Sequence, residues 1–434
     1  MQVTVIGAGL AGSECAWQLA QRGIDVTLRE MKPEKKSPAH HSDTFAELVC
    51  SNSLRSNDVT SGVGLLKEEL RRMGSLIMEA ADATQVAAGG ALAVDRKLFS
   101  EYITNKVINH PNITVHYEEV TEIPTDAVTV IATGPLTSDA MAEKISTLVG
   151  GKKLSFFDAA APIVDFSTID MEKAFFASRY DRGTPDYINC PMTREEYLAF
   201  YEALISAEEA RLHDFEKGEK LKVFEGCMPV EVMARRGEDT LRFGPMKPVG
   251  IHRPGTEESY YAVVQLRREN ESGTMYNLVG FQTHLTFPEQ RRVFRMIPGL
   301  ENADFLRYGV MHRNTFLNSP GLLSYDFSMI KKPNIYFAGQ ISGVEGYMES
   351  AASGILAGYN AARRLFGEEP IKLPKITMLG ALSQYISDES VKNFQPMGAA
   401  IGLVEPLGET IKDKKERYEK IAQRSLDYYK SIDF

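Results

Sequence analysis

The fold of this chain is decided by its first thirty residues, MQVTVIGAGLAGSECAWQLAQRGIDVTLRE (1–30). A short apolar run of strand type opens this stretch, and a second one closes it just before Glu30. Between the two runs lie a helical pattern of apolar residues and three glycines in the spacing G-x-G-x-x-G, namely Gly7, Gly9 and Gly12. This order of strand, glycine turn, helix, strand and acid predicts a βαβ unit that binds a dinucleotide.

Each part of this unit has a mechanical reason. The first glycine lets the chain turn sharply off the strand, the second lets a pyrophosphate approach the backbone, and the third lets helix and strand pack closely. The start of the helix offers free N–H groups and a positive dipole to phosphate. Glu30 is placed to accept hydrogen bonds from an adenosine ribose. The predicted site for an ADP-containing cofactor is therefore Gly7, Ala8, Gly9, Leu10, Ala11, Gly12 and Glu30.

Length and composition describe an ordinary globular protein. The chain has 434 residues, enough for two or three domains, and is 43% apolar and 25% charged. No window approaches eighteen uninterrupted apolar residues, so we expect no membrane span. The chain begins with a core strand and not with the basic and apolar regions of a signal peptide, which favours the cytoplasm. The net charge of −9 does not indicate nucleic-acid binding, so a polyanion would need a local basic face.

The four cysteines, Cys15, Cys50, Cys190 and Cys227, lie far apart without a CxxC pair. A disulfide framework and a zinc site are both poorly supported by this spacing. The eight histidines also show no metal-ligand spacing. We therefore expect no metal, and cysteines that are either buried small residues or thiolate catalysts.

A later part of the chain returns to the same sheet. Residues 127–135 form an apolar run that ends at Gly134, and residues 335–337 form another that leads into the glycines Gly339, Gly343 and Gly346. A helix of small residues, 350–365, follows. A second helix start thus points into a glycine loop, as needed to close over the far end of a long dinucleotide. The pair of glycine loops favours FAD over NAD.

Local patterns give further expectations. We expect one helix over 63–82 and another over 95–109 with its N-cap near Asp95. Residues 136–325 mix helical and strand-like segments and predict a second unit. The sequence thus predicts an α/β fold: a doubly wound, Rossmann-like FAD-binding domain (1–135 plus 326–434) with an inserted α+β domain (136–325).

Longer motifs make the chain resemble one family closely, the folate- and FAD-dependent tRNA (uracil-5-)-methyltransferases (TrmFO, formerly Gid). The resemblance covers nearly the whole length, in order. It is carried by VIGAGLAGSE, AHHSDTFAELVCSNSLRSN, AAGGALAVDR, FEGCMPVEVMARRG, FGPMKPVG, VGFQTHL, GVMHRNTF, FAGQISGVEGYMESAASG and NFQPM. FEGCMP together with VCSNSLRSN is far more specific than the glycine motif, which many flavoproteins share.

The resemblance implies formation of 5-methyluridine at position 54 in the T-loop of tRNA. The carbon would come from 5,10-methylenetetrahydrofolate, and the electrons from NAD(P)H through FAD. The inserted domain would form the folate and tRNA side of the site. Three alternatives stay open: a plain FAD/NAD(P)H oxidoreductase acting on a small molecule, a relative that modifies the wobble uridine of tRNA, and a flavin-bearing tRNA-binding module without catalysis. Oligomeric state and the choice of NADH or NADPH are not indicated.

This reaction needs a thiolate and an acid/base. The resemblance points to Cys227 and Cys50; we expect Cys227 to add to C6 of uridine and Cys50 to be the acid/base or a second thiol, although the sequence cannot apportion the two roles. Arg55 lies near Cys50 in sequence, and nearby cations favour thiolate. Cys15 and Cys190 are expected to be structural.

The substrate side of the site is less sharply marked. His284, in GFQTHL, is a candidate to stack on or hydrogen-bond a pterin. For tRNA we expect a basic face beside the insertion, made of Arg235, Arg236, Lys247, Arg253 and Arg313.

Overall fold

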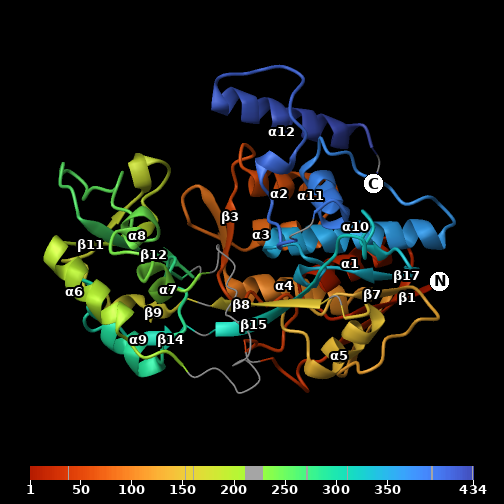
Figure 1. Ribbon diagram of the computed structural model, residues 1–434, viewed down its shortest axis with the longest axis horizontal. Helices are drawn as coiled ribbons and strands as arrows, with labels where there is room; N and C mark the ends of the chain where they lie inside the picture. Colours follow the sequence, from red (N-terminus) through yellow and green to blue (C-terminus); the bar gives the residue numbers. More distant parts are fainter. Residues whose placement is uncertain are drawn as a thin grey trace.

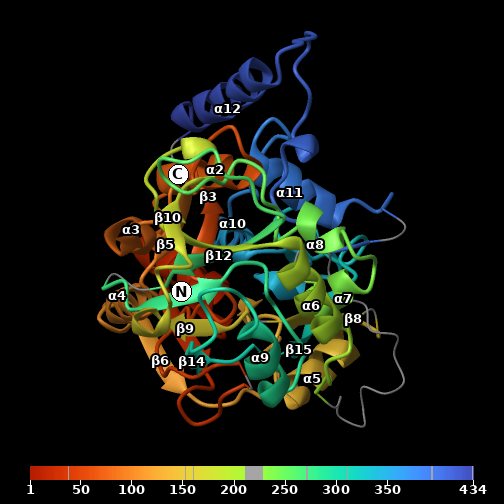
Figure 2. The ribbon, with the colours of Figure 1, turned by 90° about the vertical axis from the view of Figure 1, so that its left-hand side faces the viewer.

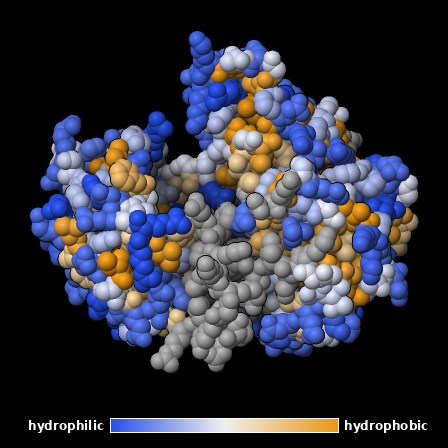
Figure 3. All heavy atoms as spheres, viewed as in Figure 1, coloured by the Kyte–Doolittle hydropathy of each residue, from blue (hydrophilic) through white to orange (hydrophobic). Residues whose placement is uncertain are grey.

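A computed structural model describes residues 1–37, 39–151, 153–159, 161–210, 228–269, 272–309, 311–391, 394–432 and 434, and for 153–159 and 311–314 it describes the backbone alone. Two six-stranded sheets lie side by side in the described part of the chain (Figures 1 and 2). Both chain ends lie on the part of the molecule that carries the first of these sheets. On the face drawn in Figure 3, hydrophobic residues lie among hydrophilic ones. None of the helices described is both long and apolar enough to cross a membrane.

The first sheet has six strands in the order β16-β17-β7-β1-β2-β6. All neighbours in it are parallel except the edge pair β16 and β17. Helices α1 and α10 lie over one face and α5 over the other (Figure 1). This confirms the predicted α/β fold class with a parallel, Rossmann-like sheet. Its strands are β1 (Gln2–Ile6), β2 (Asp25–Glu30), β6 (Ile113–Tyr117), β7 (Thr129–Ile131), β16 (Ser328–Met329) and β17 (Lys332–Phe337).

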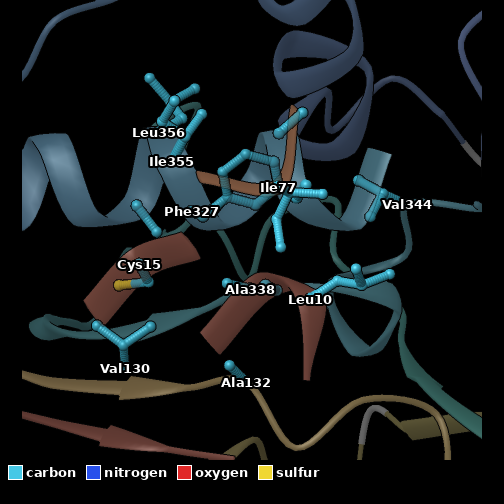
Figure 4. Close-up of a cluster of buried hydrophobic side chains, with 14 of the residues drawn as sticks. Leu10, Cys15, Ile77, Val130, Ala132, Phe327, Ala338, Val344, Ile355 and Leu356 are labelled. Carbon is cyan, nitrogen blue, oxygen red and sulfur yellow. The ribbon is translucent and has the colours of Figure 1, made fainter. Parts of the chain in front are cut away.

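Helix α1 (Leu10–Gln21) packs directly against α10 (Tyr347–Leu365), which begins three residues before the predicted helix 350–365. A Cβ at Gly354 would lie 2.3 Å from the carbonyl oxygen of Ala11, and one at Gly358 would lie 3.0 Å from that of Cys15. The two glycines therefore let the helix backbones touch. Figure 4 shows this layer, with Cys15 between Val130 of the sheet and Ile355 of α10 in that view.

The expected single helix over 63–82 is wrong. The chain forms α2 (Gly62–Arg72) and α3 (Leu76–Ala83), because Gly74 takes a φ of +70° and Ser75 caps the second helix by accepting from the Met78 amide. The next helix, α4 (Arg96–Ile108), follows the prediction, and the Asp95 carboxylate accepts from the amides of Lys97 and Leu98. A small antiparallel sheet precedes it, formed by β3 (Ser53–Ser56), β4 (Gln85–Val86) and β5 (Ala91–Val94).

The second sheet is antiparallel, in the order β10-β11-β12-β13-β9-β14. A hydrophobic cluster distinct from that of the first sheet lies beneath it. Its strands are β9 (Ile163–Asp165), β10 (Phe175–Ala177), β11 (Tyr187–Met192), β12 (Ala262–Arg268), β13 (Met275–Leu278) and β14 (Phe305–Arg307). The helices beside it are α6 (Arg194–Ile205), α7 (Val230–Ala234), α8 (Thr240–Phe243) and α9 (Phe287–Phe294).

The limits of the inserted domain, 136 and 325, stay a prediction. Helix α5 (Asp139–Leu148) and the pair β8 (Lys153–Ala159) and β15 (Met311–Leu317) lie between the two sheets in sequence. Met141, Ile145 and Phe316 of these elements belong to the hydrophobic cluster of the first sheet. The chain therefore changes from one core to the other inside the predicted insertion.

The tail is fastened to α2 by a buried carboxylate. Glu69 accepts from the amides of Met378 and Leu379 at the start of α11 (Met378–Ser387), at 2.7 and 2.9 Å. Its oxygens also accept from the hydroxyls of Ser425, at 2.5 Å, and Tyr429, on α12 (Lys414–Lys430). Burial raises the pKa of Glu69 from 4.5 to about 7, against the opposing effect of these donors.

We predict that Glu69→Gln alters the pH dependence of stability. Because burial gives Glu69 a higher pKa in the folded chain, the folded state binds more protons between about pH 4.5 and 7, so wild-type stability falls as the pH rises through that window. Across this window the free energy of unfolding of the wild type falls by about 1–3 kcal/mol. Glu69→Gln cannot titrate and should not show this fall. Urea unfolding at pH 5 and pH 7.5 measures the difference. Glu68→Gln, one residue away and partly exposed, is the matched control and keeps the wild-type slope; identical slopes in all three proteins would contradict the prediction.

Candidate functional site

A cleft of about 1110 Å³, counting the space open to solvent at its mouth, runs along the carboxyl ends of the first sheet's parallel strands. Its walls come from the turn after β1, the end of β2, the segment after β7 and the loop before α10. Of the eleven predicted cofactor residues, eight line it: Gly7, Ala8, Gly9, Leu10, Ala11, Glu30, Gly134 and Gly339. Gly12, Gly343 and Gly346 are not among its lining residues.

The three glycines of the N-terminal motif differ in what surrounds them. Gly7 has a φ of +95°, and a Cβ there would lie 2.6 Å from the Ala132 carbonyl oxygen. A Cβ on Gly12 would lie 1.8 Å from the carbonyl oxygen of Gly7, so this glycine packs the helix onto the turn. A Cβ on Gly9 would meet no atom within 4 Å. Gly9 therefore leaves open space beside the start of α1, a cradle that fits the pyrophosphate of a dinucleotide.

One end of the cleft is polar. Glu30 is buried, and its two carboxylate oxygens accept from the amides of Ala8 and Lys32 at 2.7 and 2.9 Å. These bonds fix a carboxylate beside the glycine turn, where a ribose hydroxyl can donate to it. His40 lines the same end. Burial, with a smaller effect of the Lys32 charge, lowers the pKa of His40 to about 4, so its ring is neutral at pH 7.

The other end is formed by Gly339, Gln340, Tyr347, Ser350 and Val49. The loop 339–346, which leads into α10, is held from behind by the tail. Its Glu345 amide donates to the Met397 carbonyl at 2.8 Å, and the Met397 amide donates to the Gly343 carbonyl at 3.0 Å. Gly343 and Gly346 therefore shape this end without lining it.

Cys50 lies just beyond the Tyr347 end of the cleft. The amides of Cys50 and Ser51 donate to the Tyr347 hydroxyl at 2.8 and 3.2 Å. Burial, followed by the charge of Cys50, raises the pKa of Tyr347, so its phenol stays neutral at physiological pH. Cys50 thus follows a residue that lines the cleft, Val49, and its amide is bonded to another, Tyr347.

Three arginine side chains donate hydrogen bonds to residues 48–52. We call these residues the Cys50 segment. The guanidinium of Arg96, at the start of α4, donates to the Leu48 carbonyl, and that of Arg307, on β14, donates to the Val49 carbonyl at 2.6 Å. Arg267, on β12, donates to the Ser51 hydroxyl at 2.6 Å. Arg96 and Arg307 interact electrostatically with Cys50. Cations so placed favour the thiolate form of a cysteine.

These partners differ from those expected. The Arg55 side chain, expected near Cys50, pairs instead with the buried Glu349 at 3.3 Å. Tyr347, Arg96 and Arg307 were missed by the sequence reasoning. Tyr347 and Arg96 stand inside two of the quoted family motifs, FAGQISGVEGYMESAASG and AAGGALAVDR, which is the signal that could have found them. Arg307 carries no such signal.

The other cysteines divide into two kinds. Cys227 lies outside the described residues, so its predicted role stays a prediction. Its near neighbour Met228 is buried, and the amide of Val230 donates to the Gln282 carbonyl at 2.7 Å. Cys15 and Cys190 are fully buried in the two hydrophobic clusters, and burial raises the pKa of both thiols. They are packed as small apolar residues, as the sequence predicts.

His284 lies in a buried polar cluster of the second sheet. Its amide donates to Glu231 at 2.8 Å, and its Nδ1 lies 3.6 Å from a carboxylate oxygen of Glu209. Hydrogen bonds from His284 and Arg235, with His284 the larger effect, lower the pKa of Glu209 to about 2. His284 is 8% exposed. A contact of its ring with a pterin stays a prediction.

The residues of the predicted basic face lie on several elements. Arg235 pairs with Glu209, and Lys247 is exposed. Arg253 donates to the Lys173 carbonyl at 3.0 Å and lies over the Phe175 ring. Arg236 is not free of interactions, and the side chain of Arg313 lies outside the described part of the chain. A role of this face in RNA binding stays a prediction.

Within the described ranges, no group of three or more His, Cys, Asp and Glu side chains is arranged to hold a metal ion.

Comparisons with known proteins give one family. Residues 2–369 match the family described as glucose inhibited division protein A. Two similar relatives are both named methylenetetrahydrofolate–tRNA-(uracil-5-)-methyltransferase TrmFO. The one from Acetivibrio thermocellus is 60% identical, with 99% of this chain and 98% of the relative covered. The one from Enterococcus faecalis is 59% identical, with 98% and 97% covered.

Among solved structures, that of GidA from Aquifex aeolicus has a similar fold. It superposes with a TM-score of 0.71 at 18% identity, covering 99% of this chain and 73% of the GidA chain. The GidA chain is thus longer than the part shared with this protein.

We predict that Gly9→Val separates folding from cofactor binding. The Cβ of the new side chain would have no protein atom within 4 Å, so the substitution causes no clash. The side chain would instead occupy the open space beside the start of α1. The protein without cofactor should keep its midpoint of thermal unfolding, while flavin retained after purification, measured by the ratio of absorbance at 450 and 280 nm, should fall more than about tenfold. Gly402→Val is the control, because a Cβ there also meets nothing within 4 Å. Full flavin retention by Gly9→Val would place the pyrophosphate elsewhere.

We predict that Arg307→Met slows alkylation of Cys50 by iodoacetamide. Loss of the cation destabilises the thiolate by about 1 kcal/mol, which lowers the thiolate fraction at pH 7. The rate of alkylation should therefore fall about fivefold. The measurement uses a Cys227→Ala background, in which the buried Cys15 and Cys190 do not compete. Arg307→Lys keeps the charge and should retain most of the rate. A rate unchanged in Arg307→Met would show that this cation does not act on the thiol.

Proposed function

Because this chain belongs to the family of glucose inhibited division protein A, and matches relatives named TrmFO at 58–60% identity over nearly its whole length, we propose how it works as a methylenetetrahydrofolate-dependent tRNA (uracil-5-)-methyltransferase. The product is 5-methyluridine at position 54 in the T-loop of tRNA. The carbon comes from 5,10-methylenetetrahydrofolate.

The cleft along the first sheet is the proposed site of FAD. Glu30 would bind the adenosine ribose, the backbone at Gly9 and the start of α1 the pyrophosphate, and the end formed by Gly339 and Tyr347 the flavin ring. The open space at Gly9 and the carboxylate fixed beside it support this fit. FAD, when bound and reduced by NAD(P)H, supplies hydride.

The chemistry requires the chain's own thiols, because C5 of uridine is a poor nucleophile. We propose that the Cys227 thiolate adds to C6 and gives an enolate, whose C5 then attacks the one-carbon unit. A base removes the C5 proton, and the electron pair left on C5 expels the nitrogen of the one-carbon carrier, which leaves an exocyclic methylene on the pyrimidine. A hydride then reduces this methylene to the methyl group. Loss of the thiolate from C6 restores the pyrimidine double bond and releases the enzyme.

Cys50 is the proposed base for the C5 proton. The single observation that carries this placement is the contact between the cleft and the Cys50 segment: Tyr347 lines the cleft, and its hydroxyl accepts from the Cys50 amide at 2.8 Å. Arg96 and Arg307 interact electrostatically with Cys50 and would favour its thiolate, the form that accepts a proton, although Arg96 also pairs with the buried Glu269 at 2.6 Å.

The three rival functions make different demands. A plain FAD/NAD(P)H oxidoreductase would turn over without RNA, and a binding module would bind RNA without methylating it. A wobble-uridine enzyme would modify the anticodon and not the T-loop. The names of the relatives, and the near-complete coverage, favour a tRNA methyltransferase over a plain oxidoreductase or a binding module.

We predict that Cys227→Ala retains FAD and loses methylation of a T-loop stem–loop RNA by more than about a hundredfold. It should also form no covalent adduct with the same RNA carrying 5-fluorouridine at position 54, assayed by denaturing gel. Cys50→Ala should lose turnover to a similar extent. Cys190→Ala, a buried thiol remote in sequence from both, is the control and should stay within a fewfold of wild type.

Adduct formation by Cys227→Ala would move the nucleophile elsewhere. Turnover of wild type without methylenetetrahydrofolate, or on the anticodon stem–loop, would contradict the function itself.

A further inference from the structure

Three aromatic rings stack in a row beside helix α9. The ring centroids of Phe287 and Tyr308 lie 4.8 Å apart with an interplanar angle of 15°, and those of Tyr308 and Phe305 lie 5.5 Å apart at 16°. We call these three residues the aromatic row. Phe287, its outer end, is 51% exposed, whereas phenylalanine is most often buried. The row therefore ends on a fixed aromatic ring that faces solvent.

A groove of about 950 Å³, counting solvent space, adjoins this ring. The described residues that line it are two aromatic residues, a proline and three arginines: Phe287, Tyr308, Pro288, Arg291, Arg292 and Arg295. Arg292 pairs with Glu289 at 2.6 Å, and Arg295 lies 3.5 Å from Asp304. Arg291 has no ion pair with a described residue; its Nε donates to the Tyr308 hydroxyl at 3.0 Å.

The aromatic row is linked to the Cys50 segment through the chain itself. Tyr308 follows Arg307 directly in the chain, and Arg307 holds the Val49 carbonyl of the Cys50 segment. Adjacent Cα atoms are about 3.8 Å apart. Both ribbon views place α9 and β14 side by side on the second sheet's part of the molecule (Figures 1 and 2).

We propose that the aromatic row is a stacking platform for an unpaired base of the RNA substrate, with Arg291 contacting the adjoining phosphate. The proposal rests on the proposed function, because it takes the RNA to be the tRNA whose uridine reaches the Cys50 segment. RNA loops are recognised by splaying bases onto aromatic rings, with cations beside them for the backbone.

Charge favours RNA over a protein partner for this groove. The whole chain carries a net charge of −9, yet the described lining of the groove contains cations and no carboxylate. Arg292 and Arg295 are paired with Glu289 and Asp304, so Arg291 is the cation that the groove offers to a phosphate.

The test is equilibrium binding of a T-loop stem–loop RNA by the full-length, flavin-containing protein. We expect Phe287→Ala to weaken binding between about fivefold and about a hundredfold. Phe287→Trp, which keeps a stacking ring, should restore it, and Phe287→Leu, which keeps only apolar area, should not. Arg291→Met should reduce the slope of log K against log salt by about one unit. Phe243→Ala removes another exposed phenylalanine, 82% exposed on α8, and is the control.

RNA carrying 2-aminopurine at single loop positions gives a second readout, since its fluorescence falls when the base stacks on a ring. Quenching at one position, lost in Phe287→Ala and regained in Phe287→Trp, supports the platform. Wild-type binding by Phe287→Ala with an unchanged salt slope for Arg291→Met would overturn it, as would equal effects of Phe287→Ala and Phe243→Ala. A protein that binds RNA in a Phe287-dependent way without methylating it would keep the platform and overturn the proposed function.

Discussion

The direct contact between the backbones of α1 and α10 is the constraint on which the site depends. Gly354 lies against Ala11 and Gly358 against Cys15, so the two helices run in the same direction with a fixed register. Their N-termini therefore open at the same end, into one cleft lined by Gly9 and Tyr347. Each start of a helix brings free N–H groups and a positive dipole. A side chain at either glycine would separate the helices and widen the distance between the two ends of the proposed cofactor site.

The Cys50 segment joins this cleft to the second sheet. Its amides bind Tyr347, on a helix of the first part, while its carbonyls and hydroxyls bind Arg267 and Arg307, from strands of the second sheet. A guanidinium offers several donors in a rigid fork, so two arginines fix the backbone of the segment as well as adding charge. Positioning and electrostatics are thus supplied by the same residues. Two members of the aromatic row, Phe305 and Tyr308, flank Arg307 in the chain.

Buried glutamates fasten several elements of the structure. Glu14 of α1 accepts from the amides of Leu76 and Ile77 at the start of α3, and Glu69 of α2 does the same for α11. Burial raises the pKa of both carboxyl groups. In each case a carboxylate from one helix satisfies the otherwise unpaired N–H groups of another, which costs less than leaving those donors buried and unbonded. This device fixes the helices around the first sheet without disulfides or metals in the described part of the chain.

The sequence by itself determined the local features of this protein. The turn at Gly7, the close packing at Gly12 and the cap at Asp95 depend on backbone conformation, which is why spacing alone reveals them. The break between α2 and α3 was missed, although Gly74 and Ser75 marked it, because the helical pattern of apolar residues continues across it.

Only the tertiary structure decided what surrounds the proposed catalytic thiol. The Cys50 amide meets the Tyr347 hydroxyl 297 positions away, and Arg267 meets Ser51 across 216 positions. Arg55, the nearest arginine in sequence, is turned away to Glu349. Such contacts depend on how two sheets pack against one segment, and packing is set by the shape of the whole chain and not by the spacing of neighbours along it.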